Sequence, residues 1–170
     1  MTFLVNHQQP LNGNNVAKEK DEAYMQQALS HAHLGAEQGE VPVGAILVLN
    51  DTVIASAANG SIQSCDPTAH AEILALKQGA LALGNYRLLN TTLYVTLEPC
   101  LMCIGAMVHA RITRLVYGAY DLKSGAVTSC ATLLDAPFLN HHVSYCGGVL
   151  APACGEVLRT FFKARRRKVG

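Results

Sequence analysis

The sequence lacks the features that would place the protein in a membrane or direct it out of the cell. No run of eighteen apolar residues occurs among its 170 residues, which argues against a transmembrane helix. The first twenty residues, MTFLVNHQQPLNGNNVAKEK, lack the basic-then-apolar order and the cleavage site of a secretory signal. We therefore expect an intracellular (cytoplasmic) protein, whose six cysteines are thiols or metal ligands and not disulfides.

Internal repeats and low-complexity segments are also missing, and the length fits a single domain. Half of the residues are apolar, so a sizeable core can form. Composition changes only at the two ends of the chain. Residues 1–19 are polar and rich in asparagine, and we expect a flexible arm there, followed by one domain over residues 20–170. The tail RTFFKARRRKVG holds six of the thirteen Lys and Arg residues and no acidic residue.

The pattern of apolar residues predicts an alternation of helices and strands. We expect helices over about 21–38, 67–83, 99–110 and from Pro152 onward, and strands over 41–50, 52–59, 91–96, 113–119 and 143–147. Asn50 and Asp51 would form the turn of a hairpin, and residues 120–141 a loop with short helical pieces. This order predicts an α/β fold in which one mixed five-stranded sheet lies between layers of helices.

Two cysteines near the middle of the chain carry most of the chemical information. Cys100 and Cys103 lie one turn apart near the start of a predicted helix, directly after Pro99. The helix dipole there favours the thiolate, the form that binds metal or attacks. This spacing suits a redox dithiol, half of a structural zinc site or part of a catalytic one.

The rest of the chain decides between these readings, because it contains no second C-x-x-C motif. It does contain DPTAHAEILAL, in which His70 opens another predicted helix. One histidine and two cysteines make three ligands and leave the fourth tetrahedral position for water, which is the arrangement of a catalytic zinc.

Glu72, two residues after His70, is then the candidate for moving protons. Its carboxylate can lie beside the water without binding the metal, and can carry a proton to a substrate nitrogen. Glu98 is the competing carboxylate, and we rank it second because the end of a strand suits positioning of a loop. The arrangement H-x-E…P-C-x-x-C is the known signature of zinc nucleobase deaminases, so the roles given to these residues rest on a known motif as well as on their chemistry.

Longer segments support the same assignment. EVPVGAILV, DPTAHAEILALKQGA, NYRLLNTTLYVTLEPCLMCIGAMVHARI, VYGAYDLKSGA and FFKARRR resemble the bacterial tRNA-specific adenosine deaminases of the cytidine and deoxycytidylate deaminase superfamily, over about residues 22–168. The resemblance implies a cytidine-deaminase-like α/β/α fold, a homodimer, and one Zn²⁺ per subunit held by His70, Cys100 and Cys103. It assigns the catalytic proton shuttle to Glu72.

The resemblance also implies a substrate and the residues that bind it. The reaction is hydrolytic conversion of adenosine to inosine at wobble position 34 of a tRNA anticodon stem-loop, with tRNA-Arg as the expected substrate. The base must be splayed out of the loop into a pocket. The substrate-binding residues carried over from the family are Asn59, Ala71, Glu98, Asp121, Lys123, Arg165 and Arg166.

Three positions depart from the family pattern. Ala58 replaces an aromatic residue, Cys65 stands where a histidine is familiar, and Tyr120 stands where a charged residue is common. None belongs to the metal set, and they leave the fit of the flanking nucleotides open.

Other readings remain for parts of the sequence. Asn59 precedes a glycine and could be an ordinary turn residue, Asp121 could brace a loop, and the basic tail could be a solvated surface. The competing functions are a deaminase of a free base or nucleoside such as guanine or cytidine, a non-catalytic zinc-stabilised RNA-binding subunit, and a thiol redox protein.

Overall fold

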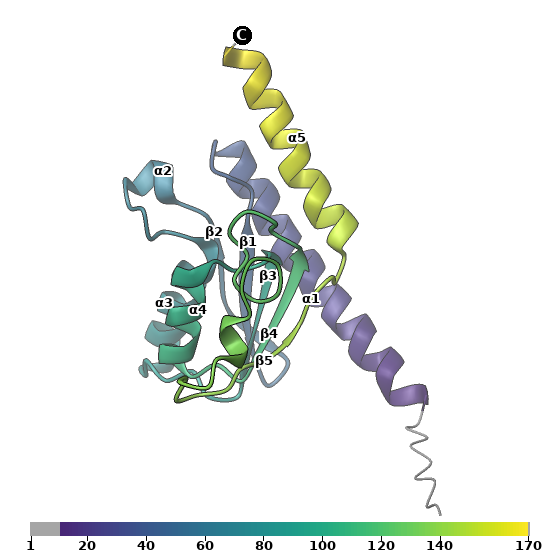
Figure 1. The fold of residues 1–170 in the computed structure, drawn as a ribbon, viewed down its shortest axis with the longest axis vertical. Coiled ribbons are helices and arrows are strands. Elements are labelled where there is room, and N and C mark those ends of the chain that lie inside the picture. Colours follow the sequence, from purple (N-terminus) through teal and green to yellow (C-terminus); the bar gives the residue numbers. More distant parts are fainter. Residues whose placement is uncertain (1–10, 170) are drawn as a thin grey trace, which may run out of the picture.

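A computed structural model describes residues 11–169, and it has the predicted order of elements with one short helix, α2, in addition (Figure 1). Residues 1–10, part of the expected arm, lie outside the described residues. The elements are α1 (Leu11–Glu37), β1 (Gly44–Leu49), β2 (Thr52–Ala58), α2 (Ser61–Ser64), α3 (Ala71–Leu83), β3 (Thr91–Leu97), α4 (Leu101–Ala110), β4 (Arg114–Ala119), the short 3-10 helix η1 (Leu133–Asp135), β5 (Ser144–Cys146) and α5 (Ala151–Val169).

The first helix begins earlier than the sequence indicated. We expected it from Asp21, but α1 starts at Leu11, so residues 11–19 of the expected arm are helical. This stretch has little apolar periodicity, so the pattern of apolar residues did not predict it as helical. Lys20 pairs with Asp51 in the turn between β1 and β2, and Lys18 lies 3.9 Å from Glu22 one turn further along. The expected boundary at residues 19 and 20 therefore falls inside a helix.

The third helix begins later than expected. Asp66 accepts hydrogen bonds from the backbone N–H of Thr68 at 2.8 Å and from its hydroxyl at 2.7 Å, so it closes a local turn and does not cap the helix. α3 starts only after His70, whose backbone is still extended (φ −73°, ψ 150°). The predicted start at residue 67 was wrong because this turn competes with the helix for the same residues.

The sheet has the strand order β2-β1-β3-β4-β5. β1 pairs antiparallel with β2 and with β3, whereas β3, β4 and β5 are parallel to one another. The carboxyl ends of β2, β3, β4 and β5 therefore lie at one end of the sheet, together with the start of β1. The segments that follow those four strands, and the segment that leads into β1, all meet at that end.

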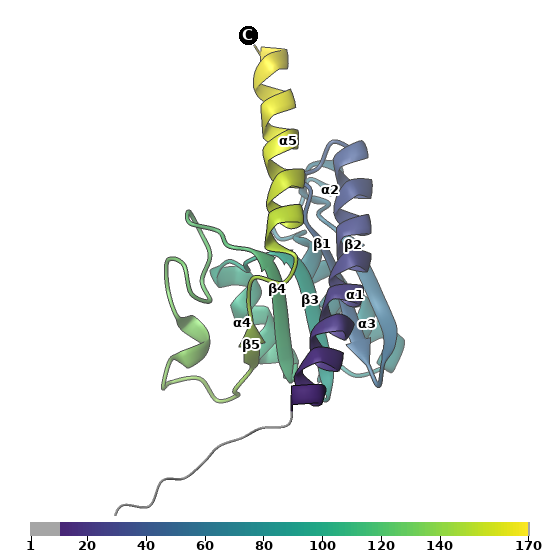
Figure 2. The ribbon, with the colours of Figure 1, turned by 90° about the vertical axis from the view of Figure 1, so that its right-hand side faces the viewer.

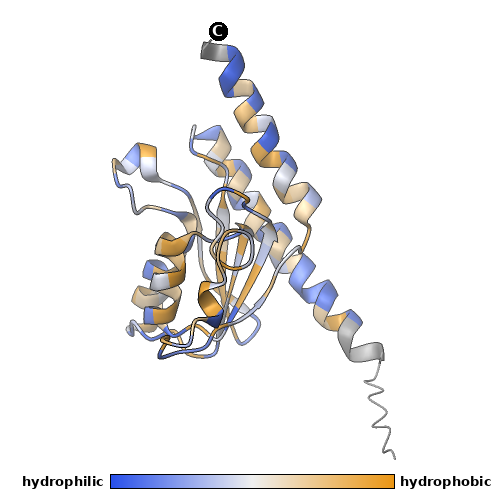
Figure 3. Cartoon of the chain, in the orientation of Figure 1, coloured by the Kyte–Doolittle hydropathy of each residue, from blue (hydrophilic) through white to orange (hydrophobic). Residues whose placement is uncertain are grey.

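Helices cover both faces of the sheet (Figures 1 and 2). On one face, Leu47, Val95 and Leu115 pack with α3 and α4; on the other, Ile46 and Val116 pack with α1 and α5. Neighbouring residues of a strand alternate between the two cores, as the period of a strand requires. Hydrophobic residues accordingly gather on the strands and on the inner sides of α3 and α4, while the C-terminal part of α5 is largely hydrophilic (Figure 3).

Polar contacts of Asp21 attach α1 to β3 and β4, far from the C-terminal end of the helix. Asp21 accepts two hydrogen bonds from the Arg114 guanidinium, at 2.8 and 2.7 Å, and one from the Tyr94 hydroxyl at 2.8 Å. Burial opposes ionisation of Asp21, but these donors outweigh it and lower the pKa of the carboxyl.

No helix within residues 11–169 combines the length and apolar character needed to cross a membrane.

Candidate functional site

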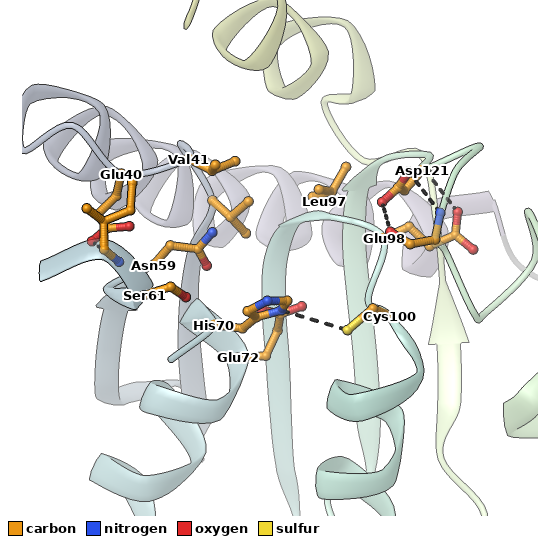
Figure 4. A pocket seen from close by; sticks show the side chains of 13 residues that line it. Glu40, Val41, Asn59, Ser61, His70, Glu72, Leu97, Glu98, Cys100 and Asp121 are labelled. Atoms are coloured by element: carbon orange, nitrogen blue, oxygen red, sulfur yellow. Dashed lines mark hydrogen bonds between the residues drawn. The ribbon is translucent and has the colours of Figure 1, made fainter. Parts of the chain in front are cut away.

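Three potential metal ligands, His70, Cys100 and Cys103, converge at the carboxyl end of the parallel strands, and Figure 4 shows the first two of them. The two sulfurs of Cys100 and Cys103 are 3.7 Å apart, and the Nδ1 atom of His70 lies 3.7 Å from the first and 3.6 Å from the second. His70 directly precedes α3, which follows β2, and Cys100 directly precedes α4, which follows β3. Topology thus brings together two short motifs about 30 residues apart in sequence.

The donor atoms fit a tetrahedral zinc ion. With Zn–S bonds of about 2.3 Å and Zn–N bonds of about 2.1 Å, a tetrahedron has edges of roughly 3.6–3.8 Å. The three observed separations match these edges. Within the part of the chain that the structure describes, these residues form the one His/Cys/Asp/Glu group close enough to hold a metal, and no fourth protein ligand joins them. One coordination position therefore stays open.

The protonation of the two thiols also favours a cation between them. Hydrogen bonds from Cys103 and His70 lower the pKa of Cys100 to about 3. The neighbouring Cys100 sulfur and burial raise the pKa of Cys103, because a second negative charge would be placed beside the first. The pocket beside the thiols is lined by four carboxylates and by no Lys or Arg. A divalent metal supplies the positive charge that would allow both thiols to ionise.

Glu72 lies in the first turn of α3 beside His70, where the sequence predicted a proton carrier (Figure 4). Its side chain lines the pocket, and the residue is only 3% exposed. Burial raises the pKa of this carboxyl. Glu72 is outside the ligand group, so its oxygens remain available for a substrate in the pocket.

Asn59 follows β2 and lines the same pocket. Its side-chain Oδ1 accepts a hydrogen bond from the backbone N–H of Ala71 at 2.8 Å, which leaves the amide NH₂ as a donor for a bound base. Ala71 itself is fully buried and is not among the residues that line the pocket. Ala71, expected among the substrate-binding residues, thus contacts Asn59 through its N–H group and does not line the pocket itself.

One wall of the pocket consists of residues that the sequence did not predict to belong to the site. Glu40, Val41, Ser61 and Ile62 line it. Glu40 is 1% exposed, and its carboxylate accepts hydrogen bonds from the backbone N–H groups of Ile62 at 2.9 Å and Gln63 at 2.8 Å. A glutamate directly before a buried apolar strand was the signal in the sequence, since a buried carboxylate requires donors.

Glu98, the second-ranked proton carrier, organises a loop instead. One carboxylate oxygen accepts hydrogen bonds from the backbone N–H groups of Val127, Thr128 and Ser129, and the other from the N–H of Asp121 and the Ser129 hydroxyl. Burial opposes its ionisation, but the Ser129 hydroxyl and these N–H groups lower the pKa of the carboxyl. Glu98 lines the pocket while its oxygens hold residues 121–129, so direct substrate binding through this carboxylate does not fit the structure.

Asp121 lines the opposite side of the pocket together with Ser124. Its carboxylate accepts hydrogen bonds from the N–H of Lys123 at 2.9 Å and from the Ser124 hydroxyl at 2.6 Å. Asp121 thus braces its own loop and faces the pocket at the same time. Both readings of this residue agree with the structure.

The basic residues of the tail divide between two sides of α5. Lys123 and Arg166 line one cavity together with Leu158, Arg159, Phe162 and Lys163. We call this set the basic groove. Arg165 is absent from it, because its guanidinium donates to the Gly39 carbonyl at 2.8 Å and lies 4.8 Å from the centre of the Phe161 ring. Arg165 and Arg166, both carried over as substrate-binding residues, therefore have different surroundings.

The three positions that depart from the family pattern lie outside the pocket lining. Ala58 faces α1, where a Cβ added to Gly35 would lie 3.1 Å from its methyl group. Cys65 ends α2 in a left-handed conformation (φ 50°) and is exposed. Tyr120 packs edge-on against Tyr117, with ring centres 5.6 Å apart, and remains half exposed.

Comparisons with known proteins agree with this site. The family described as the cytidine and deoxycytidylate deaminase zinc-binding region matches residues 18–119. The chain is 51% identical to a tRNA-specific adenosine deaminase of Haemophilus influenzae, over 90% of this chain and 89% of the relative, and 44% identical to one of Bacillus subtilis, over 88% and 92%.

Solved structures of deaminases share the fold of this chain. A tRNA:A34 deaminase studied for A-to-I editing at the wobble position of transfer RNA superposes with a TM-score of 0.78 at 43% identity, covering 80% of this chain and 99% of that one. A guanine deaminase from Bacillus subtilis superposes with a TM-score of 0.58 at 29% identity, covering 86% and 93%. The predicted α/β fold with its five-stranded mixed sheet is confirmed.

Proposed function

The chain belongs to the tRNA-specific adenosine deaminases, within the cytidine and deoxycytidylate deaminase family, and on that premise we propose that it converts adenosine to inosine at the wobble position of a tRNA anticodon. The observation that carries this proposal is the three-ligand cluster with one open coordination position, placed beside a buried carboxylate at the base of a pocket. As the resemblance implies, we expect tRNA-Arg to be the substrate.

The zinc ion that His70, Cys100 and Cys103 would hold supplies an activated water molecule. Glu72 would carry two protons in turn: the first passes from the attacking water to the ring nitrogen of the base, and the second passes from the oxygen now bonded to the ring carbon to the amino group, which leaves as ammonia when the C–N bond breaks. The Asn59 NH₂ group donates to the base and orients it. Burial of Glu72 keeps bulk water away from these transfers.

Recognition of RNA, rather than of a free base, is supported by the surface outside the pocket. The basic groove contains four cationic side chains, Lys123, Arg159, Lys163 and Arg166, and its Lys123 belongs to the loop that carries Asp121. Cations placed in this way contact phosphates around a splayed base and hold the loop in register. The aromatic ring of Phe162 in the groove provides a surface on which a base can stack.

We further propose a homodimer that acts in the cytoplasm, where tRNA is found. The outer face of α4 supports the dimer, because Leu101, Gly105 and His109 are exposed at successive turns directly after Cys100. Leu101 is 68% exposed, so a second subunit placed against this face would bury it and gain hydrophobic stabilisation. Light scattering should give twice the 18.1 kDa chain mass, and a monomeric mass would remove the dimer from the proposal.

The decisive experiment is incubation of the purified protein with unmodified tRNA-Arg, followed by reverse transcription and sequencing. Inosine is read as guanosine, so the wobble adenosine should appear as guanosine. Parallel reactions contain free adenosine, guanine and cytidine. Deamination of a free base or nucleoside without editing of tRNA would replace the proposed function by its runner-up, and the absence of both would leave only a zinc-stabilised binding protein.

A further inference from the structure

Arg165 stands apart from the other basic residues of α5 by its contacts. The residues of the basic groove recur at intervals of three or four along one side of the helix, namely Leu158, Arg159, Phe162, Lys163 and Arg166. The Arg165 guanidinium instead lies over the ring of Phe161, one turn earlier, and donates to the carbonyl of Gly39 at 2.8 Å. Planar stacking of this kind fixes the direction in which the guanidinium donates.

The carbonyl that Arg165 contacts belongs to the junction between α1 and the pocket wall. Gly39 has a left-handed conformation (φ +83°) that ends α1 and turns the chain toward β1. The next two residues, Glu40 and Val41, line the pocket. A shift of the Gly39 carbonyl would therefore move a segment that contacts the substrate.

The same junction is connected to the other half of that wall. The buried Glu40 carboxylate accepts the N–H groups of Ile62 and Gln63, and the Gln63 side chain donates to the Gln38 carbonyl at 3.4 Å. Ser61 and Ile62 in turn line the pocket. Residues 38–41 are thus held by α2 from one side and by Arg165 from the other.

We propose that Arg165 is a positioning residue, which holds the pocket wall formed by residues 40–41 and 61–62 in place through the Gly39 carbonyl, and does not serve as a phosphate contact. This inference rests on the proposed deaminase function and names a route by which the RNA-facing helix fixes the shape of the base pocket. Arg165 would thereby link α5, which carries most of the basic groove, to the pocket wall.

Two measurements separate a positioning residue from a phosphate contact. A phosphate contact contributes about 0.7 to the slope of log affinity against log salt concentration for a single strand, and its loss raises KM. A residue that donates to a neutral carbonyl leaves the salt slope unchanged. Because it acts on the shape of the pocket, its loss lowers the rate of the bound complex.

The test compares Arg165→Ala, Arg166→Ala and the matched control Arg87→Ala on an anticodon stem-loop. Arg87 is also an exposed arginine stacked on a neighbouring aromatic ring, 5.4 Å from the centre of Tyr86, but it lines no described cavity. We expect Arg165→Ala to lower the single-turnover rate at saturating RNA about three- to tenfold with a wild-type salt slope, since a hydrogen bond from a charged donor is lost. Arg166→Ala should reduce the slope and spare the rate, and Arg87→Ala should change neither.

Arg165→Lys provides a rescue, because lysine can still donate to the Gly39 carbonyl but lacks the planar group that stacks on Phe161. We expect its rate to lie between those of the wild type and Arg165→Ala. A reduced salt slope with an unchanged saturating rate in Arg165→Ala would overturn the inference and return Arg165 to the phosphate contacts. An inactive wild-type protein would instead refute the proposed function. For each variant, zinc content and a circular dichroism spectrum that match those of the wild type would show that the metal site and α5 remain intact.

Discussion

Two halves of the site are built in different ways: the metal half, and the half that we propose to contact RNA, which we call the RNA-facing half. The metal half consists of residues that directly precede or open two helices, and it is packed against the core: Cys103 is fully buried and Glu72 nearly so. The RNA-facing half consists of exposed cations on α5 and of a loop that long-range hydrogen bonds hold in place. The chemical groups are therefore encoded in short motifs, whereas the fit of the substrate depends on contacts between segments that are distant in the sequence.

Glu98 connects the two halves. It lies two residues before Cys100, and its carboxylate binds the N–H groups of residues 121 and 127–129. Glu40 has the corresponding role on the other wall of the pocket, where it holds α2. Two buried glutamates thus fix the walls that surround the metal, and neither is available for moving protons.

The largest effect is expected from loss of a ligand in the metal half. Cys103→Ala leaves two ligands, which cannot retain zinc against dilution, so metal content and deamination should both fall below detection. Melting temperature should fall as well, because the remaining thiol and imidazole lose their common partner. Cys146→Ala, at an exposed cysteine on the edge strand, is the control and should keep one zinc per chain. Full activity of Cys103→Ala without metal would refute a catalytic zinc.

Removal of the proton carrier should leave the metal half assembled but inactive. We expect Glu72→Ala to keep one zinc per chain and the wild-type melting temperature, while deamination falls by about 10²- to 10⁴-fold, the usual contribution of general acid–base catalysis. Metal analysis and inosine formation on the stem-loop measure the two effects. Near-normal turnover would show that another group carries the protons.

A smaller effect is expected where the two halves are joined. In Glu98→Gln the amide oxygen can still accept from the N–H groups of residues 127–129, and the Ser129 hydroxyl can turn to accept from the new NH₂ group. The backbone N–H of Asp121 then faces that NH₂ group, and two donors meet. This loses one hydrogen bond to a charged acceptor, and we expect kcat/KM for the stem-loop to fall about tenfold. Zinc content should be unchanged. Unchanged kcat/KM would separate the 121–129 loop from substrate binding.

The smallest effect is expected in the RNA-facing half alone. Replacement of Arg166 and Arg167 by Ala should weaken binding of the stem-loop only several-fold at moderate salt, but should reduce the salt slope by about 1.4 if both arginines contact phosphates. Arg165 is left intact in this variant because its contacts are with the protein. A titration across salt concentrations measures the slope, and a wild-type slope would withdraw the end of α5 from the RNA site.

The sequence predicted the elements best where local chemistry determines them. The Asn50–Asp51 turn formed as expected, with both residues at positive φ (48° and 63°), a conformation that asparagine and aspartate tolerate. The predicted strand over 91–96 became β3 with one further residue. The start of α1 at Leu11 could not be predicted, because residues 11–19 lack the apolar period by which a helix is found in sequence.

By itself the sequence predicted the candidate ligand set, the candidate proton carrier and the order of the main elements, because a known motif and the period of apolar side chains carry these signals. Only the tertiary structure decided that Glu98 organises a loop, that Glu40 builds a pocket wall, and that Arg165 faces Gly39 while Arg166 faces the groove. The physical reason is that a carboxylate or a guanidinium takes its role from the donors and acceptors within reach. Here those partners come from segments that lie 22 to 126 residues away in the chain.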